Sequence, residues 1–249
     1  RSRKIKFVNT RHEQIAAHAA DGYARATKKA SVLLSHLSPG LTNAATGVAN
    51  AALDSIPMVV IAGDVPTHYY GKHPHQEVNL HADASQSEIY RPFVKRVWRV
   101  DSPHLFPEIL EKAFALAESG RPGPVLVDVP MDVFSKEIDV ALWKQVQLNA
   151  RTVRKPSLDD ETAEKIVRQL LAAKTPVLYV GGGILLADAA QEMREFAEQL
   201  SLPVAHTLMG KGVPFLESRE KNHFIRVDPP EWQQALAILD QSQPEGALA

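Results

Sequence analysis

Apolar runs of strand length alternate with segments of helical periodicity along the chain, which is typical of a largely parallel β-sheet with helices on its faces. Apolar residues recur at helical spacing from Phe106 to Ala117 and form one amphipathic face. Pro122 and Pro124 end that helix before the next strand begins. The predicted strands of this first unit are Ile5 to Val8, Ser31 to Leu34, Met58 to Ala62 and Val125 to Val129.

The periodicity lapses into charged and polar residues between positions 131 and 156, where no clear element is indicated. We interpret residues 131–156 as an interdomain linker. The sequence therefore predicts an α/β fold of two consecutive units, residues 1–130 and residues 157–249, each with an open, mostly parallel sheet flanked by helices.

The second unit repeats the strand and helix pattern on a smaller scale. Ser157 is suited to cap a helix whose apolar positions run from 163 to 171. A strand at 176–180 leads into three glycines, a second helix and a further strand at 203–206.

Charge and composition exclude several classes of function. The 249 residues hold 28 basic and 29 acidic side chains, so the net charge of -1 argues against a nucleic-acid or anionic-membrane partner. The chain has no cysteine, which excludes disulfides and thiolate chemistry, and no apolar run of about 18 residues, so we expect a cytoplasmic protein. His73, His75 and His81 do not match known zinc spacings, and no metal site is expected within the chain.

Glu13 opens a helix of small residues directly after the predicted strand Ile5 to Val8. Ligands of open α/β sheets usually bind at such strand-to-helix junctions. A glutamate in a first helical turn also complements the helix dipole on many protein surfaces, so the residue by itself leaves both interpretations open.

Three blocks together resemble the pyrimidine-binding domain of thiamine-diphosphate enzymes of the acetolactate synthase-like group. They occur in the order and spacing of that family, and the resemblance covers roughly residues 1 to 215. It implies decarboxylation and carboligation of 2-keto acids with thiamine diphosphate as cofactor. The blocks are RHEQIAAHAADGYARAT (Arg11 to Thr27), SVLLSHLSPGLTNAATGVANAALDSIPMVVIAGDVPT (Ser31 to Thr67) and GRPGPVLVDVP (Gly120 to Pro130).

The resemblance assigns roles to residues around the cofactor's aminopyrimidine ring. Glu13 matches the glutamate that hydrogen-bonds the ring nitrogen N1′ and so activates the cofactor. The turn Ser38-Pro39-Gly40, expected before a helix at 42–53, matches a ring-contacting Gly-Pro-Gly loop, with Ser38 in place of the first glycine. Asn43 follows in the first turn of that helix.

Two further residues are candidates for contact with the substrate. His36 stands where acetolactate synthases carry a small hydroxyl residue, and a related decarboxylase branch has a catalytic histidine at the equivalent distance. A histidine at a strand end is otherwise most often a hydrogen-bonding residue without catalytic function. Gln76 matches the glutamine of a Phe-Gln-Glu segment that faces the reacting centre, with His75 in place of the phenylalanine.

The second unit resembles the central domain of the same family. Gly181-Gly182-Gly183 and Thr207-Leu208-Met209 match two turns that contact FAD in flavin-carrying members. Many central domains of the family keep this fold without a flavin, so FAD is one of two alternatives.

Several parts of the resembled family have no counterpart in these residues. The opening strand and helix of the first domain, several elements of the central domain, and the Gly-Asp-Gly motif that binds Mg²⁺ with the diphosphate are not found. We therefore expect the chain to supply the pyrimidine side of an active site that is completed by a domain absent from it, in a homodimer or homotetramer, and to be inactive alone. The alternatives are a benzoylformate decarboxylase-like or lyase-like member of the family, and a non-catalytic oligomerisation or nucleotide-binding module.

Overall fold

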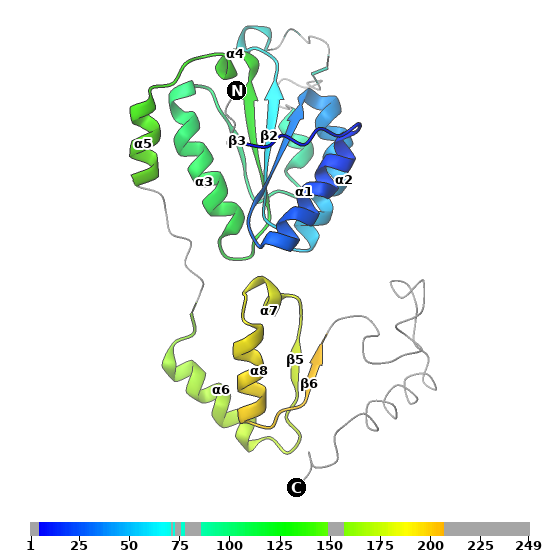
Figure 1. The fold of residues 1–249 in the computed structure, drawn as a ribbon, viewed down its shortest axis with the longest axis vertical. Helices are drawn as coiled ribbons and strands as arrows, with labels where there is room; N and C mark the ends of the chain where they lie inside the picture. Colours follow the sequence, from blue (N-terminus) through cyan, green and yellow to red (C-terminus); the bar gives the residue numbers. More distant parts are fainter. Residues whose placement is uncertain (1–4, 71, 73–75, 78–85, 149–156, 207–249) are drawn as a thin grey trace, which may run out of the picture. The chain divides into compact units, whose positions relative to one another are not determined.

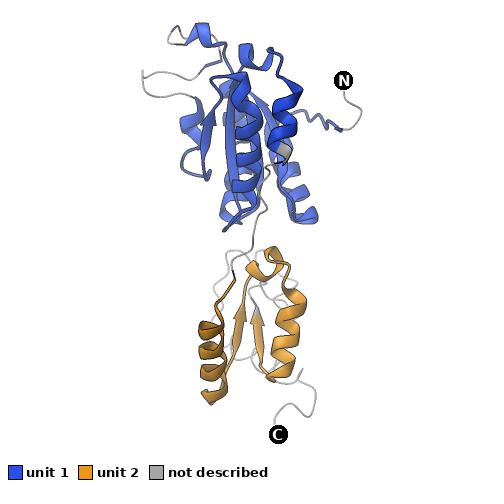
Figure 2. Ribbon diagram, turned by 90° about the vertical axis from the view of Figure 1, so that its left-hand side faces the viewer, with its two compact units in different colours: residues 1–156 blue, residues 157–249 orange. Residues whose placement is uncertain are grey.

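A computed structural model describes residues 5–70, 72, 76–77, 86–148 and 157–206 of the chain. The chain divides into two compact units, Arg1–Pro156 and Ser157–Ala249, which Figure 2 colours separately. Each unit is an α/β layer structure of its own. No helix in the described ranges is long and apolar enough to cross a membrane.

The first unit is built on a four-stranded sheet in which every neighbouring pair of strands is parallel. The spatial order is β1-β2-β4-β3. Because the strands are parallel, their carboxyl ends meet at one edge of the sheet, at the top in Figure 1. The strands are β1 (Ser31–His36), β2 (Met58–Asp64), β3 (Val97–Arg99) and β4 (Pro124–Pro130).

Helices cover both faces of this sheet, and two apolar clusters hold them there. Strand β4 is buried along its whole length because it lies between the two clusters. On one face α1 (Glu13–Thr27) and α2 (Leu37–Leu53) pack with the 3₁₀ turn η2 (Gln86–Tyr90), and on the other α3 (Phe106–Glu118) packs on β2 and β4. Strand β1 alternates, with Leu33 buried under α1 and α2. The short elements η1 (Thr67–Tyr69), η3 (Pro103–Leu105) and α4 (Met131–Phe134) and the helix α5 (Val140–Leu148) complete this unit.

Small residues allow α1 and α2 to lie in direct contact. The facing positions are mostly alanine and glycine, among them Ala17, Ala44 and Gly47, and all three are buried. A Cβ added to Gly47 would lie 2.6 Å from the Ala17 Cβ and 3.1 Å from the backbone nitrogen of His18. Glycine is therefore required at position 47 by the close approach of two backbones.

The second unit is smaller. It contains α6 (Asp160–Ala172), β5 (Leu178–Val180), α7 (Gly183–Leu186), α8 (Ala190–Gln199) and β6 (Val204–His206), and β5 pairs with β6 in parallel. The cap of α6 is Asp159, whose carboxylate accepts a hydrogen bond from the Thr162 amide at 2.8 Å. The expectation for Ser157 was wrong because the helix begins three residues later, where a carboxylate also complements the helix dipole.

The structure corrects three further expectations about local elements. Residues Ile5 to Val8 form no strand and are exposed. Helix α2 begins at Leu37 and not near Thr42, so the Ser-Pro-Gly sequence forms its first turn, where proline needs no hydrogen-bond partner. The range 131–156 contains α4 and α5, and the Trp143 ring meets the Phe106 ring edge-on.

A network of buried polar side chains crosses the sheet near its carboxyl edge. Asp64 at the end of β2 pairs with Arg99 of β3 at 3.0 Å, and the Arg99 guanidinium lies over the Tyr70 ring. Asp128 of β4 is fully buried, and its Oδ2 has no hydrogen-bond partner among the described residues. Burial, reinforced by the nearby Asp64 charge, raises the pKa of Asp128 to about 7.

Two glycine substitutions separate the helix contact from helix propensity. Gly47→Ala should lower the free energy of unfolding, because overpacking costs about 1–3 kcal/mol and exceeds the gain in helix propensity of about 1 kcal/mol. Gly22→Ala in α1 should raise it, because a Cβ added there meets nothing within 4 Å. Urea unfolding of the two variants measures both effects, and equal midpoints would contradict the close contact at Gly47.

The stability of the first unit should depend on pH through Asp128. Its folded-state pKa lies above the ordinary value of 3.8, so the neutral acid is favoured in the fold. The stabilisation is fully present below that ordinary value and is lost as the pH rises through about 7. Asp128→Asn removes this dependence. The free energy of unfolding of the variant, relative to that of the wild type, should therefore rise by about 3 kcal/mol between pH 5 and pH 8.

The measurement is urea unfolding at both pH values. Asp64, Arg99 and Asp101 also act on the Asp128 charge and are unchanged in the variant. A difference between the two proteins that stays constant with pH would show that Asp128 is ionised in the folded chain throughout.

Candidate functional site

The candidate site lies at the carboxyl edge of the first sheet, where α1 and α2 begin. A pocket of about 610 Å³ opens there. Both Glu13 and His36 line it, so the structure brings two of the three predicted catalytic residues to one cavity. The complete lining is Val8, Asn9, Thr10, Arg11, His12, Glu13, Ala16, Leu34, Ser35, His36, Gly63, Met131 and Phe134.

Glu13 is the first residue of α1, and its carboxylate is held from the neighbouring helix. His12 caps α1 by accepting the Gln14 amide hydrogen on Nδ1. Asn43 of α2 donates its side-chain amide to Glu13 Oε2 at 3.0 Å. This hydrogen bond is the main cause that lowers the pKa of Glu13. The pocket therefore presents an oriented, ionised carboxylate that can accept a proton or a hydrogen bond from a ligand.

Gly40 lies between the Glu13 side chain and the Ser35 hydroxyl. A Cβ added to Gly40 would meet the Ser35 hydroxyl oxygen at 2.5 Å and the Glu13 Cγ at 3.7 Å. The Ser35 hydroxyl is buried and has no hydrogen-bond partner in the described structure, although Ser35 lines the pocket. Glycine is therefore required at position 40 because the Ser35 hydroxyl packs where a side chain would begin.

The first turn of α2 starts from a strained residue. Leu37 has a φ of 53°, in the left-handed region that bulky residues rarely adopt. Ser38 is fixed from two sides, because its amide donates to the Gln76 carbonyl at 3.2 Å and its hydroxyl donates to Gln86 Oε1 at 3.1 Å. Pro39 is exposed in the same turn. The predicted ring-contacting turn is therefore the rigid start of a helix.

His36 lies on the opposite side of β1 from Ser35. It is paired in register with Gly63 of β2, and a Cβ added to Gly63 would lie 3.1 Å from His36 Nδ1. The imidazole is exposed toward the pocket. A histidine in this position can exchange a proton with a ligand while the carboxylate of Glu13 contacts another part of it.

The backbone of Gln76, and not its side chain, contacts the start of α2. Its φ is 66°, its side chain is exposed, and its carbonyl accepts a hydrogen bond from the Ser38 amide. His75, which stands in place of the phenylalanine of the resembled segment, lies outside the described residues.

Sequence reasoning missed Ser35 and Gln86. Ser35 could have been found from its place in β1, where alternate residues are buried against α1 and α2. This alternation directs the Ser35 side chain toward Gly40. Gln86 has no periodic or motif signal in the sequence, and its burial is visible only in three dimensions.

The second unit holds the residues predicted to contact FAD. Gly181, Gly182 and Gly183 are exposed at the turn between β5 and α7, and a Cβ added to Gly182 or Gly183 meets nothing within 4 Å. Thr207, Leu208 and Met209 lie outside the described residues. The turn is therefore open at these two positions, and no close backbone approach within the described structure requires glycine at 182 or 183.

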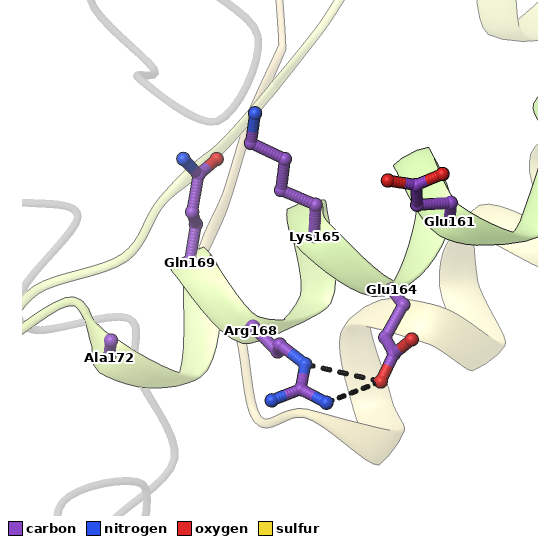
Figure 3. Close-up of a pocket in the computed structure, with 6 residues that line it drawn as sticks. All are labelled: Glu161, Glu164, Lys165, Arg168, Gln169 and Ala172. Carbon is purple, nitrogen blue, oxygen red and sulfur yellow. Dashed lines mark hydrogen bonds and ion pairs between the residues drawn. The ribbon is translucent and has the colours of Figure 1, made fainter.

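A second hollow, of about 440 Å³, lies beside α6 and is lined by that helix alone. Its side chains are drawn in Figure 3, where Arg168 turns back to bond Glu164 at 2.6 Å. A single exposed helix face brings no groups together from separate elements, so this hollow is a weak candidate for a site. Within the described ranges, no group of three or more His, Cys, Asp or Glu side chains is arranged to hold a metal ion.

Comparison with known proteins gives matches along both units. The model of the thiamine pyrophosphate enzyme N-terminal TPP binding domain matches residues 1–86, and the model of the thiamine pyrophosphate enzyme central domain matches residues 163–223. Both descriptions name the same cofactor.

Similar curated proteins include acetolactate synthase large subunits. The chain is 43% identical to that of Corynebacterium glutamicum over 220 residues, which cover 88% of this chain and 34% of the relative. It is 41% identical to the probable large subunit of Methanococcus aeolicus over 209 residues, covering 82% of this chain and 33% of the relative. The isozyme 3 large subunit of Escherichia coli is also 41% identical, with 84% of this chain and 35% of that protein covered.

The chain spans about a third of the length of the curated relatives it matches. The two domain models follow one another along the sequence in the order of their names, N-terminal before central. From this order and from the identity to relatives, we conclude that the chain belongs to the thiamine pyrophosphate enzyme family.

Proposed function

We propose that the first unit supplies the aminopyrimidine side of a thiamine diphosphate site, in an enzyme of acetolactate synthase type that decarboxylates and ligates 2-keto acids. The observation that carries this proposal is the Glu13 carboxylate, held by Asn43 at the mouth of a pocket beside Gly40. The similarity to acetolactate synthase large subunits supports the choice of reaction.

The residues at the pocket suit a flat, nitrogen-containing ring. Glu13 would hold a proton at the ring nitrogen N1′, and the Asn43 amide would keep the carboxyl oriented toward it. Gly40 would contact the ring from the first turn of α2, as the resemblance implies, and the unpartnered Ser35 hydroxyl offers one further hydrogen bond. When bound, thiamine diphosphate supplies the nucleophile and the electron sink for cleavage next to a carbonyl group.

His36 supports a second candidate, a decarboxylase-like or lyase-like member of the same family. Its imidazole lines the same pocket as Glu13, so it can donate a proton to the substrate fragment that remains after carbon dioxide has left. The two reactions differ in their product from pyruvate, which is acetolactate for the synthase and acetaldehyde for the decarboxylase.

Further components belong to the proposal. We assign Mg²⁺ to a separate diphosphate-binding domain and FAD, if a flavin is used, to the open glycine turn at Gly181–Gly183. We propose a homodimer or homotetramer as the assembly. A titration of the protein with FAD, monitored by flavin fluorescence, tests the flavin assignment. Its outcome does not bear on the proposal for the first unit.

Glu13→Gln tests the central role. In a chimera that carries these residues in place of the matched segment of the C. glutamicum large subunit, we expect acetolactate formation from pyruvate to fall about 100-fold or more. The amide keeps the shape of the side chain but cannot exchange the proton. Turnover at saturating thiamine diphosphate and Mg²⁺ is the measurement.

Glu161→Gln is the matched control, because Glu161 is also a glutamate in the first turn of a helix and lies on exposed α6. It should leave turnover unchanged. Equal turnover of the two variants, with both chimeras folded by circular dichroism, would reject the role of Glu13.

His36→Ala should lower turnover in the same chimera about 100-fold while it weakens thiamine diphosphate binding much less, as expected of a group that acts on the substrate. Steady-state kinetics and calorimetric cofactor titration provide the two numbers. His104→Ala changes an exposed histidine outside the pocket and serves as the control. A His36 variant with full turnover and a lower melting temperature would make His36 a structural residue.

A further inference from the structure

Gln86 is a buried amide that does not itself line the candidate pocket. It belongs to η2 and is only 1% exposed, although its side chain is polar. A buried amide of this kind requires hydrogen-bond partners. Its side chain reaches three separate elements of the fold. The Nε2 group donates to the Gly63 carbonyl of β2 at 2.9 Å and to Asp128 Oδ1 of β4 at 3.0 Å, and Oε1 accepts from the Ser38 hydroxyl of α2 at 3.1 Å.

The chemistry of these partners allows one orientation of the amide. The Gly63 carbonyl oxygen can only accept, and the Nε2 group supplies its two hydrogens to this oxygen and to Asp128 Oδ1. The remaining oxygen therefore faces Ser38, whose hydroxyl can donate. Because all these groups are buried, each lost bond would leave a polar atom without a partner in a region of low dielectric.

Two partners of Gln86 belong to the segments that position His36 and Glu13. Gly63 is the register partner of His36, and its Cα faces the His36 ring. Ser38 belongs to the first turn of α2, and Asn43 lies further along the same helix and bonds Glu13 at 3.0 Å. The three hydrogen bonds of Gln86 go to neither Glu13 nor His36, yet they join the segments that carry these two residues.

Leu37 explains why this turn needs a fixed anchor. Its left-handed φ of 53° is unfavourable for leucine, and such a conformation persists only where its surroundings impose it. The anchor on the adjacent residue is the hydroxyl of Ser38, which is itself 1% exposed. Without it the backbone at Leu37 could relax, and the start of α2 would move.

We propose that Gln86 is a positioning residue, which fixes the first turn of α2 against the end of β2 and so determines where Asn43 meets the Glu13 carboxyl. Its meaning for catalysis rests on the proposed function. The geometric claim does not, because it can be measured in the 249-residue chain without cofactor or substrate. A failure of the Glu13→Gln prediction in the chimera would therefore leave this claim standing, and the reverse also holds.

The readout is the pKa of the Glu13 carboxyl, followed by ¹³C NMR as the pH is changed. The Asn43 hydrogen bond lowers this pKa, so Asn43→Ala should raise it and gives the full scale of the effect. Gln86→Met keeps the length of the side chain and removes all three hydrogen bonds. We expect it to raise the Glu13 pKa by most of that amount and to shift the amide resonances of Leu37, Ser38 and Gly40.

Ser38→Ala is the milder second variant. It removes the bond between Gln86 and α2 and keeps the bonds of Gln86 to Gly63 and Asp128. It should move the Glu13 pKa in the same direction, and it decides the matter if Gln86→Met does not fold.

Tyr90→Phe is the matched control. Tyr90 lies in η2 like Gln86, is fully buried, and donates its hydroxyl to the Leu41 carbonyl of α2 at 2.6 Å. The variant should lower the melting temperature and leave the Glu13 pKa at its wild-type value. An unchanged Glu13 pKa in folded Gln86→Met and Ser38→Ala, or an equal rise in Tyr90→Phe, would overturn the proposal.

Discussion

The contact between α1 and α2 determines the geometry of the whole site. Glu13 stands on one helix and Asn43 on the other, so their hydrogen bond of 3.0 Å depends on how closely the two backbones approach. Gly47 against Ala17 sets that distance, because any larger side chain would separate the helices. A sequence of small residues along this interface is therefore a requirement of the carboxylate's position as well as of packing.

Buried polar groups behind the pocket oppose the stability that the apolar clusters provide. Asp64 and Asp128 are both buried, and burial raises the pKa of each, even though Arg99 lies 3.0 Å from Asp64. An apolar core of the same shape would be at least as stable, since paired buried charges often fail to recover their desolvation. What the network provides instead is direction, because hydrogen bonds hold Gln86 and its partners in one arrangement.

The sequence predicted the architecture well where the pattern is local and strong. Three of the strands, β1, β2 and β4, follow from their apolar runs, and the parallel α/β class follows from their alternation with helices. Strand β3 was missed because Val97–Arg99 is short and only half-buried, so its pairing with β4 leaves little trace in the residues. Ile5 to Val8 was predicted as a strand because the run is apolar, but it forms none. An apolar run becomes a strand only where a neighbouring strand is available to pair with it.

The site was predictable to the extent that a motif carries it. Glu13, Ser38, Gly40 and Asn43 were named from the resemblance, and the structure brings them together at the start of two helices. The turn at Ser38 was placed before the helix because Ser-Pro-Gly suits a turn and a helix start equally. The partners that fix this arrangement could not be found in the sequence, because Gln86 acts through contacts with residues far from it along the chain.

The parallel register of the sheet also implies an order of assembly. The segment from α1 through β2 is continuous in sequence, so its contacts close short loops and are expected to form first. It contains Glu13, His36, Gly40 and Asn43. Strand β4 joins later, because Pro124, the register partner of Met58, is far from it along the chain. The folding chain should therefore acquire a loose version of the pocket early, and the hydrogen bonds that make it rigid arrive with the last strands.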